Sequence, residues 1–367
     1  MTATFAVTPL ISADSHVTEP IELYAERLPK SLRDRAPKIH NSGGWRVLEA
    51  EGMDIRKLMT ASELDLAVVG GSDREQRFRE QEQDGVAAEV VFPNWALQVC
   101  FVPEDPVLQT ALARAYNDWA AETMLGEPRI LPVGLIPMLD IEAAIIEAKR
   151  VAALGFRALF LPARVPSRPY NDDAYDPFWA VVEGLGLPLT FHSGTGHEPR
   201  VVHGPGAAVI NYLLGAQADG PSVFLHLAAG GALDRFPGLR IVTIETGAAW
   251  VAWIATQADL VYEDHKMYRK TELSLKPSEL IRRQCHATFM TDPVAIHNRS
   301  ITGVECLLWG NDYPHPEGTW PHSIDAVHEQ FVGVARDDVL AMVAGNAARV
   351  FGFDLSALPV LAGMSGR

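Results

Sequence analysis

Short, mostly apolar runs recur along the chain, separated by stretches with helical spacing or by loops. The runs do not alternate between apolar and polar residues, which is typical of parallel strands whose sheet is buried on both faces. Helical spacing is clearest at residues 106–125, 141–154, 175–185, 279–289 and 337–351. The predicted strands are residues 10–16, 87–92, 130–137, 158–162, 188–193, 222–227, 240–246 and 306–312.

Strands and helices in this alternation predict an α/β fold of the (β/α)₈ barrel type. A doubly wound open sheet is the weaker alternative, because no Gly-x-Gly-x-x-Gly motif follows the first strand. Residues 17–84 are too long for one strand–helix unit, and we interpret them as an insertion after strand 1 that caps the barrel. They contain a short β segment at 45–48 and a charged helix near 73–83. We therefore interpret residues 1–367 as one barrel domain with a C-terminal tail at 354–367.

Composition narrows the class of protein. Apolar residues make up 48% of the 367 positions, enough for a large core, and the three cysteines show no Cys-x-x-Cys spacing. That usage favours a reducing compartment, and no signal peptide or 18-residue apolar span is evident, so we expect a cytoplasmic protein without a membrane segment. A net charge of −15 disfavours nucleic acid as a partner.

Residues that commonly bind metals stand at the carboxyl ends of the predicted strands. Asp14 and His16 lie two residues apart and would point to the same face of strand 1. In a barrel these strand ends meet at the mouth, where active sites are found. Any one such residue is more simply a hydrogen-bonded structural group, but the shared position indicates a metalloenzyme with Zn²⁺, Mn²⁺ or Fe²⁺. The other members of the set are His192, His226, Glu245 and Asp312.

Together these motifs resemble the amidohydrolase superfamily, in the branch named for aminocarboxymuconate-semialdehyde decarboxylase. The resemblance runs from Ile11 to about Phe353 and implies a distorted barrel. It also implies one divalent metal ion per chain and, by analogy, a homo-oligomer. The motifs that carry it include Asp14-Ser-His-Val-Thr-Glu-Pro, Leu187-Pro-Leu-Thr-Phe-His, His226-Leu-Ala-Ala-Gly-Gly, Glu245-Thr-Gly, Gly310-Asn-Asp-Tyr-Pro-His and Gly345-Asn-Ala-Ala-Arg-Val-Phe-Gly.

By position, the resemblance assigns Asp14, His16, His192 and Asp312 as the metal ligands. The chain departs from the common His-x-His of the family, because its first ligand is an aspartate. A carboxylate is a harder ligand than imidazole, so the expected ion is Mn²⁺ as much as Zn²⁺. Strand four ends without a lysine or glutamate that could bridge a second ion, so a mononuclear site is expected.

Three residues receive catalytic assignments through the same resemblance. His226 matches the catalytic histidine and would exchange protons with the reacting groups, although a fifth metal ligand stays open as its role. Asp312 would bind the metal and also shuttle a proton. Glu245 would orient His226 or another group near the metal, and a salt bridge at the strand end is the alternative.

Other residues are candidates for substrate binding. Arg164, after strand four, could bind a substrate carboxylate through two parallel hydrogen bonds, or lie on the surface. Asn94 follows strand two and could line the mouth of the barrel. His197 belongs to a long glycine-rich loop after strand five, where a solvent-exposed role is the alternative, and His315 lies three residues after Asp312.

The reaction itself stays open between two classes. We favour a metal-dependent, non-oxidative decarboxylase that acts on a small aromatic or unsaturated carboxylic acid. The alternative is a metal-dependent hydrolase of an amide, ester or lactone, which needs the same ligands. An arginine or similar donor beside the metal would favour the decarboxylase, and a neutral pocket would favour the hydrolase. A barrel without activity is the third hypothesis, disfavoured by the intact ligand set.

Overall fold

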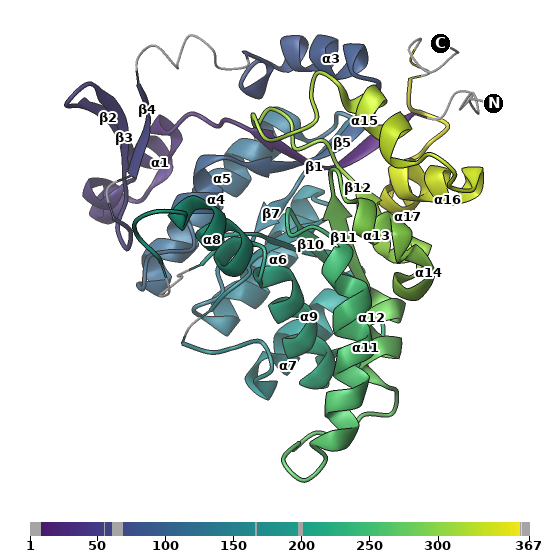
Figure 1. Ribbon diagram of the computed structural model, residues 1–367. Coiled ribbons are helices and arrows are strands. Elements are labelled where there is room, and N and C mark those ends of the chain that lie inside the picture. Colours follow the sequence, from purple (N-terminus) through teal and green to yellow (C-terminus); the bar gives the residue numbers. More distant parts are fainter. Residues whose placement is uncertain are drawn as a thin grey trace.

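A computed structural model describes residues 9–54, 56–60, 69–165, 167–196, 201–359 and 361 (Figure 1). Parallel strands form two sheets, one ordered β1-β5-β6 and the other β12-β11-β10-β9-β8-β7. The strands are β1 (Leu10–Val17), β5 (Val86–Pro93), β6 (Ile130–Pro132), β7 (Gly134–Leu135), β8 (Leu159–Pro162), β9 (Leu189–His192), β10 (Ile241–Ile244), β11 (Cys285–Phe289) and β12 (Leu307–Trp309).

The two sheets join into one closed barrel. Val133 separates β6 from β7, and its N–H donates to the carbonyl of Val91 on β5. The next N–H, that of Gly134, donates to Ala158 just before β8, so this short stretch belongs to both sheets. On the other side, Ser15 of β1 forms a parallel bridge with Tyr313, which follows β12. With β6 and β7 counted as one broken strand, the ring has eight positions, and the predicted distorted (β/α)₈ barrel is confirmed.

Helices cover the outside of the barrel, and their ends follow from the sequence (Figure 1). Asp140 caps α6 by accepting from the N–H groups of Glu142 and Ala143, and Gly155 ends it in a left-handed conformation that favours glycine. The helices are α1 (Glu22–Arg27), α3 (Arg74–Gln83), α4 (Trp95–Val99), α5 (Pro106–Met124), α6 (Ile141–Leu154), α7 (Asp176–Leu185), α8 (Ala207–Ile210), α9 (Asp219–Ala229), α10 (Ala232–Arg235), α11 (Ala249–Asp264), α12 (Pro277–Gln284), α13 (Pro293–His297), α14 (Arg299–Thr302), α15 (Ser323–Gln330), α16 (Arg336–Leu340) and α17 (Asn346–Phe351).

Two predicted elements are wrong, and their errors cancel in the strand count. The predicted strand at 222–227 lies within helix α9, and the predicted helix at 279–289 ends at Gln284, after which β11 begins. A short apolar run fits a buried strand and a buried helix equally well, so periodicity could not separate them. The strand at 240–246 is therefore the sixth in the barrel, and His226 does not stand at a strand end.

The insertion after β1 contains a second, antiparallel sheet of β2 (Lys38–Ser42), β3 (Trp45–Glu49) and β4 (Arg56–Thr60), followed by helix α3. Figure 1 shows this sheet at one side of the molecule, beside α1. The β segment at 45–48 and the charged helix are confirmed, whereas a capping role for the insertion stays a prediction. Within the tail at 354–367, Leu358 is buried. Among the described residues, no helix combines the length and the apolar surface needed to cross a bilayer.

A buried ion pair ties α3 to the first barrel strand. Arg77 of α3 donates through Nε and Nη2 to the carboxylate of Glu89 on β5, and through Nη1 to the main-chain carbonyl of His16 at 2.6 Å. Both side chains are at most 4% exposed, so the pair is largely shielded from water. Gln81 also donates to Glu89. The insertion thereby fixes the backbone of the strand that carries Asp14 and His16.

Replacing Arg77 by methionine should leave the Glu89 carboxylate buried without its cation. We expect the free energy of unfolding to fall by about 3–5 kcal/mol, measured by urea denaturation. Arg79→Met, on the exposed side of the same helix, is the control and should change stability by no more than about 0.5 kcal/mol. Equal effects of the two substitutions would show that the buried pair has no special role.

Candidate metal centre and adjoining cavity

The carboxyl ends of three barrel strands bring four of the predicted site residues together. Asp14 and His16 project from the same face of β1, His192 is the last residue of β9, and Asp312 follows β12. All four are at most 2% exposed. Three of them, Asp14, His16 and His192, offer ligand atoms that all lie within 4.8 Å of one another.

The imidazole of His16 is at the centre of this group. Its Nε2 lies 3.3 Å from Oδ1 of Asp312, 3.6 Å from Oδ1 of Asp14 and 3.3 Å from Nε2 of His192. His192 Nε2 is 3.8 Å from the same Asp14 oxygen. Four side chains thus direct nitrogen and oxygen atoms at one small volume.

The hydrogen-bond roles of these atoms show what the volume would hold. His192 Nδ1 lies 3.0 Å from the carbonyl of Ser193, which can only accept, so Nδ1 carries the hydrogen and Nε2 presents a lone pair. Both carboxylate oxygens of Asp14, and Oδ2 of Asp312, have no hydrogen-bond partner among the described residues. Buried hydrogen-bond acceptors that converge without matching N–H or O–H donors are the usual surroundings of a bound cation. The ligand atoms available here, imidazole nitrogens and carboxylate oxygens, fit Zn²⁺ or Mn²⁺.

The electrostatics of the site favour positive charge at the same point. Burial alone would lower the pKa of His16, but the adjacent carboxylates of Asp14 and Asp312 outweigh burial and raise the pKa to about 10. Burial and the charge of His16 lower the pKa of His192 to about 3, so this imidazole is neutral and able to bind a metal. Burial raises the pKa of the Asp14 carboxyl. The bonds from His16 and His315 overcome burial at Asp312 and lower its pKa.

Backbone strain is confined to the same edge of the barrel. Glu245, directly after β10, and Asp312 have φ values of 54° and 55°, and no other non-glycine residue in the described part of the chain has a positive φ. This left-handed conformation costs an L-residue roughly 1–2 kcal/mol and clusters at functional sites. Both residues turn sharply where their strands end.

Glu245 links the cluster to an open cavity. Its Oε2 lies 3.4 Å from His192 Nε2 and accepts a hydrogen bond from Ser193 Oγ, while Oε1 accepts one from Tyr212. Burial, together with the charges of Asp312 and Asp14, raises its pKa to about 8. Glu245 and Asp14 both line the cavity, so a molecule bound there would touch the cluster.

This cavity measures about 460 Å³, the size of a small-molecule site. Trp250 and Phe289 give it an aromatic wall, and Glu317 and Asp292 add carboxylates to its rim. Among the described residues, neither lysine nor arginine lines it. The cavity therefore suits a flat, partly apolar molecule and gives it no cationic side chain in the part of the chain that the structure describes.

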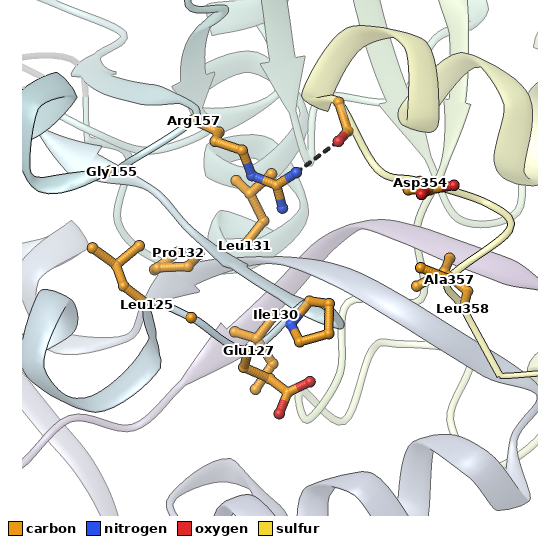
Figure 2. Close-up of a pocket in the computed structure, with 13 residues that line it drawn as sticks. Leu125, Glu127, Ile130, Leu131, Pro132, Gly155, Arg157, Asp354, Ala357 and Leu358 are labelled. Carbon is orange, nitrogen blue, oxygen red and sulfur yellow. Dashed lines mark hydrogen bonds between the residues drawn. The ribbon is translucent and has the colours of Figure 1, made fainter.

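A second cavity of about 280 Å³ lies at the start of β6 and the loop before β8, so it is remote from the strand ends that carry the cluster (Figure 2). In Figure 2 the Arg157 guanidinium donates to the carbonyl of Gly352 at 2.7 Å. None of the predicted site residues lines this second cavity, whereas Asp14 and Glu245 line the cavity of about 460 Å³, which is therefore the candidate active site.

His315 and Asn94 form a layer behind the cluster. His315 Nδ1 is 3.0 Å from Oδ1 of Asp312, and its Nε2 is 3.1 Å from Oδ1 of Asn94. The ring of His315 packs against that of His16, with centroids 4.1 Å apart. The structure therefore places both residues where they orient Asp312, and neither is among the residues that line the cavity.

Two other predicted site residues, Arg164 and His226, are not among the residues of the cluster. Arg164 forms two hydrogen bonds with the buried carboxylate of Asp219, at 2.6 and 2.8 Å, and it is not among the residues that line the cavity. His226 lies on α9, where its Nδ1 is 2.8 Å from the carbonyl of Ser222. Its expected place at a barrel strand end is wrong, because the run 222–227 is helical. His197 lies outside the described residues.

Sequence analysis did not single out Tyr212, which lines the cavity from the long loop after β9. Its segment carries neither a motif nor a regular apolar period that would single out one tyrosine. Only the folded loop brings Tyr212 to Glu245, which lies 33 positions further along the chain.

Known proteins resemble this chain in sequence. The family model Amidohydro_2, described as amidohydrolase, matches residues 65–353. Gamma-resorcylate decarboxylase of Rhodococcus jostii (strain RHA1) is 33% identical over 148 residues, 36% of this chain and 44% of that protein. Decarboxylase orsB of Emericella nidulans is 31% identical over 169 residues, 42% of this chain and 50% of that protein. The matched segments thus span half or less of these curated relatives.

Solved structures share the fold. The structure of a dihydroxybenzoic acid decarboxylase from Polaromonas sp. JS666, with bound manganese and the inhibitor 2-nitroresorcinol, superimposes with a TM-score of 0.65. The two chains are 20% identical, and the superposition covers 94% of this chain and 97% of that one.

Removing one imidazole from the cluster should abolish metal binding. We expect His192→Ala to lose most of its bound divalent metal in elemental analysis, because a site that lacks one of four ligands binds far more weakly. His226→Asn is the control and should keep the metal content of the unmodified protein, since His226 lies on α9. Loss of metal from His226→Asn would contradict the site described above.

Proposed function

Because the chain belongs to the amidohydrolase family, we propose that it catalyses the metal-dependent, non-oxidative decarboxylation of a small aromatic carboxylic acid. The observation that carries the choice of reaction is that both curated relatives are decarboxylases. The buried cluster of Asp14, His16, His192 and Asp312 beside a cavity of about 460 Å³ supports it, because that cavity fits one aromatic ring with small substituents.

In this proposal Asp14, His16, His192 and Asp312 hold one divalent ion per chain. Two carboxylates and two imidazoles accept either Zn²⁺ or Mn²⁺, and the manganese in the Polaromonas structure supports Mn²⁺. When bound, the ion would polarise the oxygen atoms of the substrate that it touches. The carbonyl of Ser193 keeps His192 in the tautomer that presents Nε2, and His315 holds Asp312.

Glu245 is the group that we assign to proton transfer. Unlike Asp312, it lines the cavity, so its carboxyl group can reach a ring carbon of a bound acid. As the bond between the ring and the carboxylate breaks, the electron pair stays on the ring carbon and CO₂ leaves. The Glu245 carboxyl then gives its proton to that carbon and regains one from solvent. The aromatic wall of Trp250 and Phe289 would hold the ring.

A metal-dependent hydrolase of an ester, amide or lactone is the second candidate. The observation that favours it is the lining of the cavity, which contains neither lysine nor arginine in the described part of the chain. With Arg164 paired to Asp219, a substrate carboxylate would depend on the metal for its positive partner. A neutral substrate would need no such partner.

Assembly into a homo-oligomer and a cytoplasmic location stay predictions.

The two candidates separate in one assay. We expect the purified protein to release CO₂ from 2,6-dihydroxybenzoate, to lose this activity after treatment with a chelator, and to regain it with Mn²⁺. A parallel panel of phenyl esters and lactones tests the second candidate. Cleavage of the panel without CO₂ release from any aromatic acid would replace the decarboxylase by the hydrolase.

Glu245→Gln should lower kcat by about 10²–10⁴-fold, the usual loss when a general acid is removed, while the bound metal stays near its normal amount. Glu263→Gln, on the exposed face of α11, is the matched control and should leave kcat unchanged. The measurement is steady-state CO₂ release with metal analysis of each variant. Near-normal turnover by Glu245→Gln would exclude it as the proton donor.

A further inference from the structure

Tyr212 is linked to the cluster through Glu245. Its hydroxyl donates to Glu245 Oε1 at 3.0 Å, and both side chains line the same cavity as Asp14. The other oxygen of Glu245 faces His192 Nε2 at 3.4 Å and Ser193 Oγ at 3.3 Å. The carboxylate is therefore held from both sides, by the loop after β9 on one and by the end of β9 on the other.

The segment that carries Tyr212 is anchored at its first residue. Residues Asn211–Ala216 form a π-helical turn, a rare conformation that often occurs at functional sites. The side chain of Asn211 accepts from the N–H of Val202 and donates to its carbonyl, both at 2.9 Å. These two hydrogen bonds connect the π-helical turn to the preceding part of the loop, at Val202.

The end of the turn is fixed to the barrel through a buried ion pair. Arg164, after β8, donates to the carbonyl of Gly215 and to both carboxylate oxygens of Asp219. Asp219 also accepts from the N–H of Gly194, directly after β9. The Asp219 side chain is 4% exposed and that of Arg164 16% exposed, so the pair is well shielded and strong. Two barrel strands thus set the position of the π-helical turn.

We propose that Tyr212 is a positioning residue that fixes the Glu245 carboxyl group between the metal cluster and the cavity, and that the Arg164–Asp219 pair supports it. The anchors at Asn211 and Gly215 place the phenol, and the phenol orients the carboxyl group. Without the hydroxyl, Glu245 would lose the bond on its cavity side and could rotate toward His192. Arg164, which was a candidate for substrate binding, instead holds the loop that carries Tyr212, through its bonds to Gly215 and Asp219.

The kinetic test rests on the proposed function and uses 2,6-dihydroxybenzoate as the probe. Tyr212→Phe keeps the ring and removes the hydroxyl, so we expect kcat to fall about ten- to a hundredfold while KM changes by less than about threefold. Tyr268→Phe, whose ring is 79% exposed, is the matched control and should behave as the unmodified protein. Melting temperatures and metal contents of both variants verify that each is folded and loaded.

A double-mutant cycle identifies the route of the effect. If Tyr212 acts through Glu245, the variant with both Tyr212→Phe and Glu245→Gln should turn over no more slowly than Glu245→Gln alone. Effects that multiply, or a Tyr212→Phe variant with normal kcat, would overturn the proposal. A merely structural role would lower stability and leave the cycle additive.

A spectroscopic test does not depend on turnover and keeps this proposal separable from the proposed function. With Co²⁺ bound in place of the native ion, the visible absorption bands report the number and geometry of the ligands. Since a released Glu245 lies close enough to His192 to approach the ion, the bands should change in Tyr212→Phe and stay the same in Tyr268→Phe. If the unmodified protein decarboxylates no acid, the proposed function fails, whatever the absorption bands show. Unchanged bands in Tyr212→Phe would independently overturn the positioning role of Tyr212.

Discussion

Two carboxylates buried at the mouth of the barrel need a positive charge beside them, and the rest of the site depends on this requirement. Asp14 and Asp312 are at most 1% exposed, and three of their four oxygens have no hydrogen-bond partner among the described residues. Ionised carboxylates taken out of water cost several kcal/mol each unless a positive charge compensates. His16 lies between them, with its Nε2 3.3 Å from Asp312 Oδ1 and 3.6 Å from Asp14 Oδ1, and the two carboxylates raise its pKa. A bound divalent ion would compensate the negative charge of the two carboxylates more fully than the single proton on His16 can.

The surroundings hold the cluster and the adjoining Glu245 in place through three separate supports. Arg77 binds the carbonyl of His16 from the insertion, and the pair of Asn94 and His315 orients Asp312. The third support reaches Glu245 from the loop after β9. Each support comes from a different part of the chain, which reduces the freedom of the cluster before any ligand binds and so favours preorganised catalysis.

The charge of the cavity bears directly on the reaction. An aromatic acid would enter a cavity whose described lining contains carboxylates and no lysine or arginine. Its negative charge would then be compensated at the metal, so binding and chemistry would share one positive centre. Under the proposed function, catalysis would depend on the ion more strictly than in a site with its own arginine, because the ion would have to position the substrate as well as activate it.

Much of this architecture follows from the sequence alone. Seven of the predicted strands coincide with barrel strands, because parallel strands covered on both faces must be short apolar runs. Strand ends of a barrel meet at one mouth, which made Asp14, His16, His192 and Asp312 candidates together, and the resemblance to the amidohydrolases then singled them out as the expected metal ligands. The sequence could not show that residues 222–227 are helical and that residues 285–289 form a strand, because a short apolar run fits either element.

Tertiary structure decided the rest, because it depends on which distant side chains meet. Asp219, 55 positions after Arg164, pairs with the guanidinium, for which the sequence had left a substrate-binding and a surface role open. The helical state of α9 keeps His226 from the strand ends, and the folded loop brings Tyr212 to Glu245. Local sequence fixes the periodicity and the ends of elements, whereas a hydrogen bond between loops depends on their closure over the barrel, for which no short-range pattern exists.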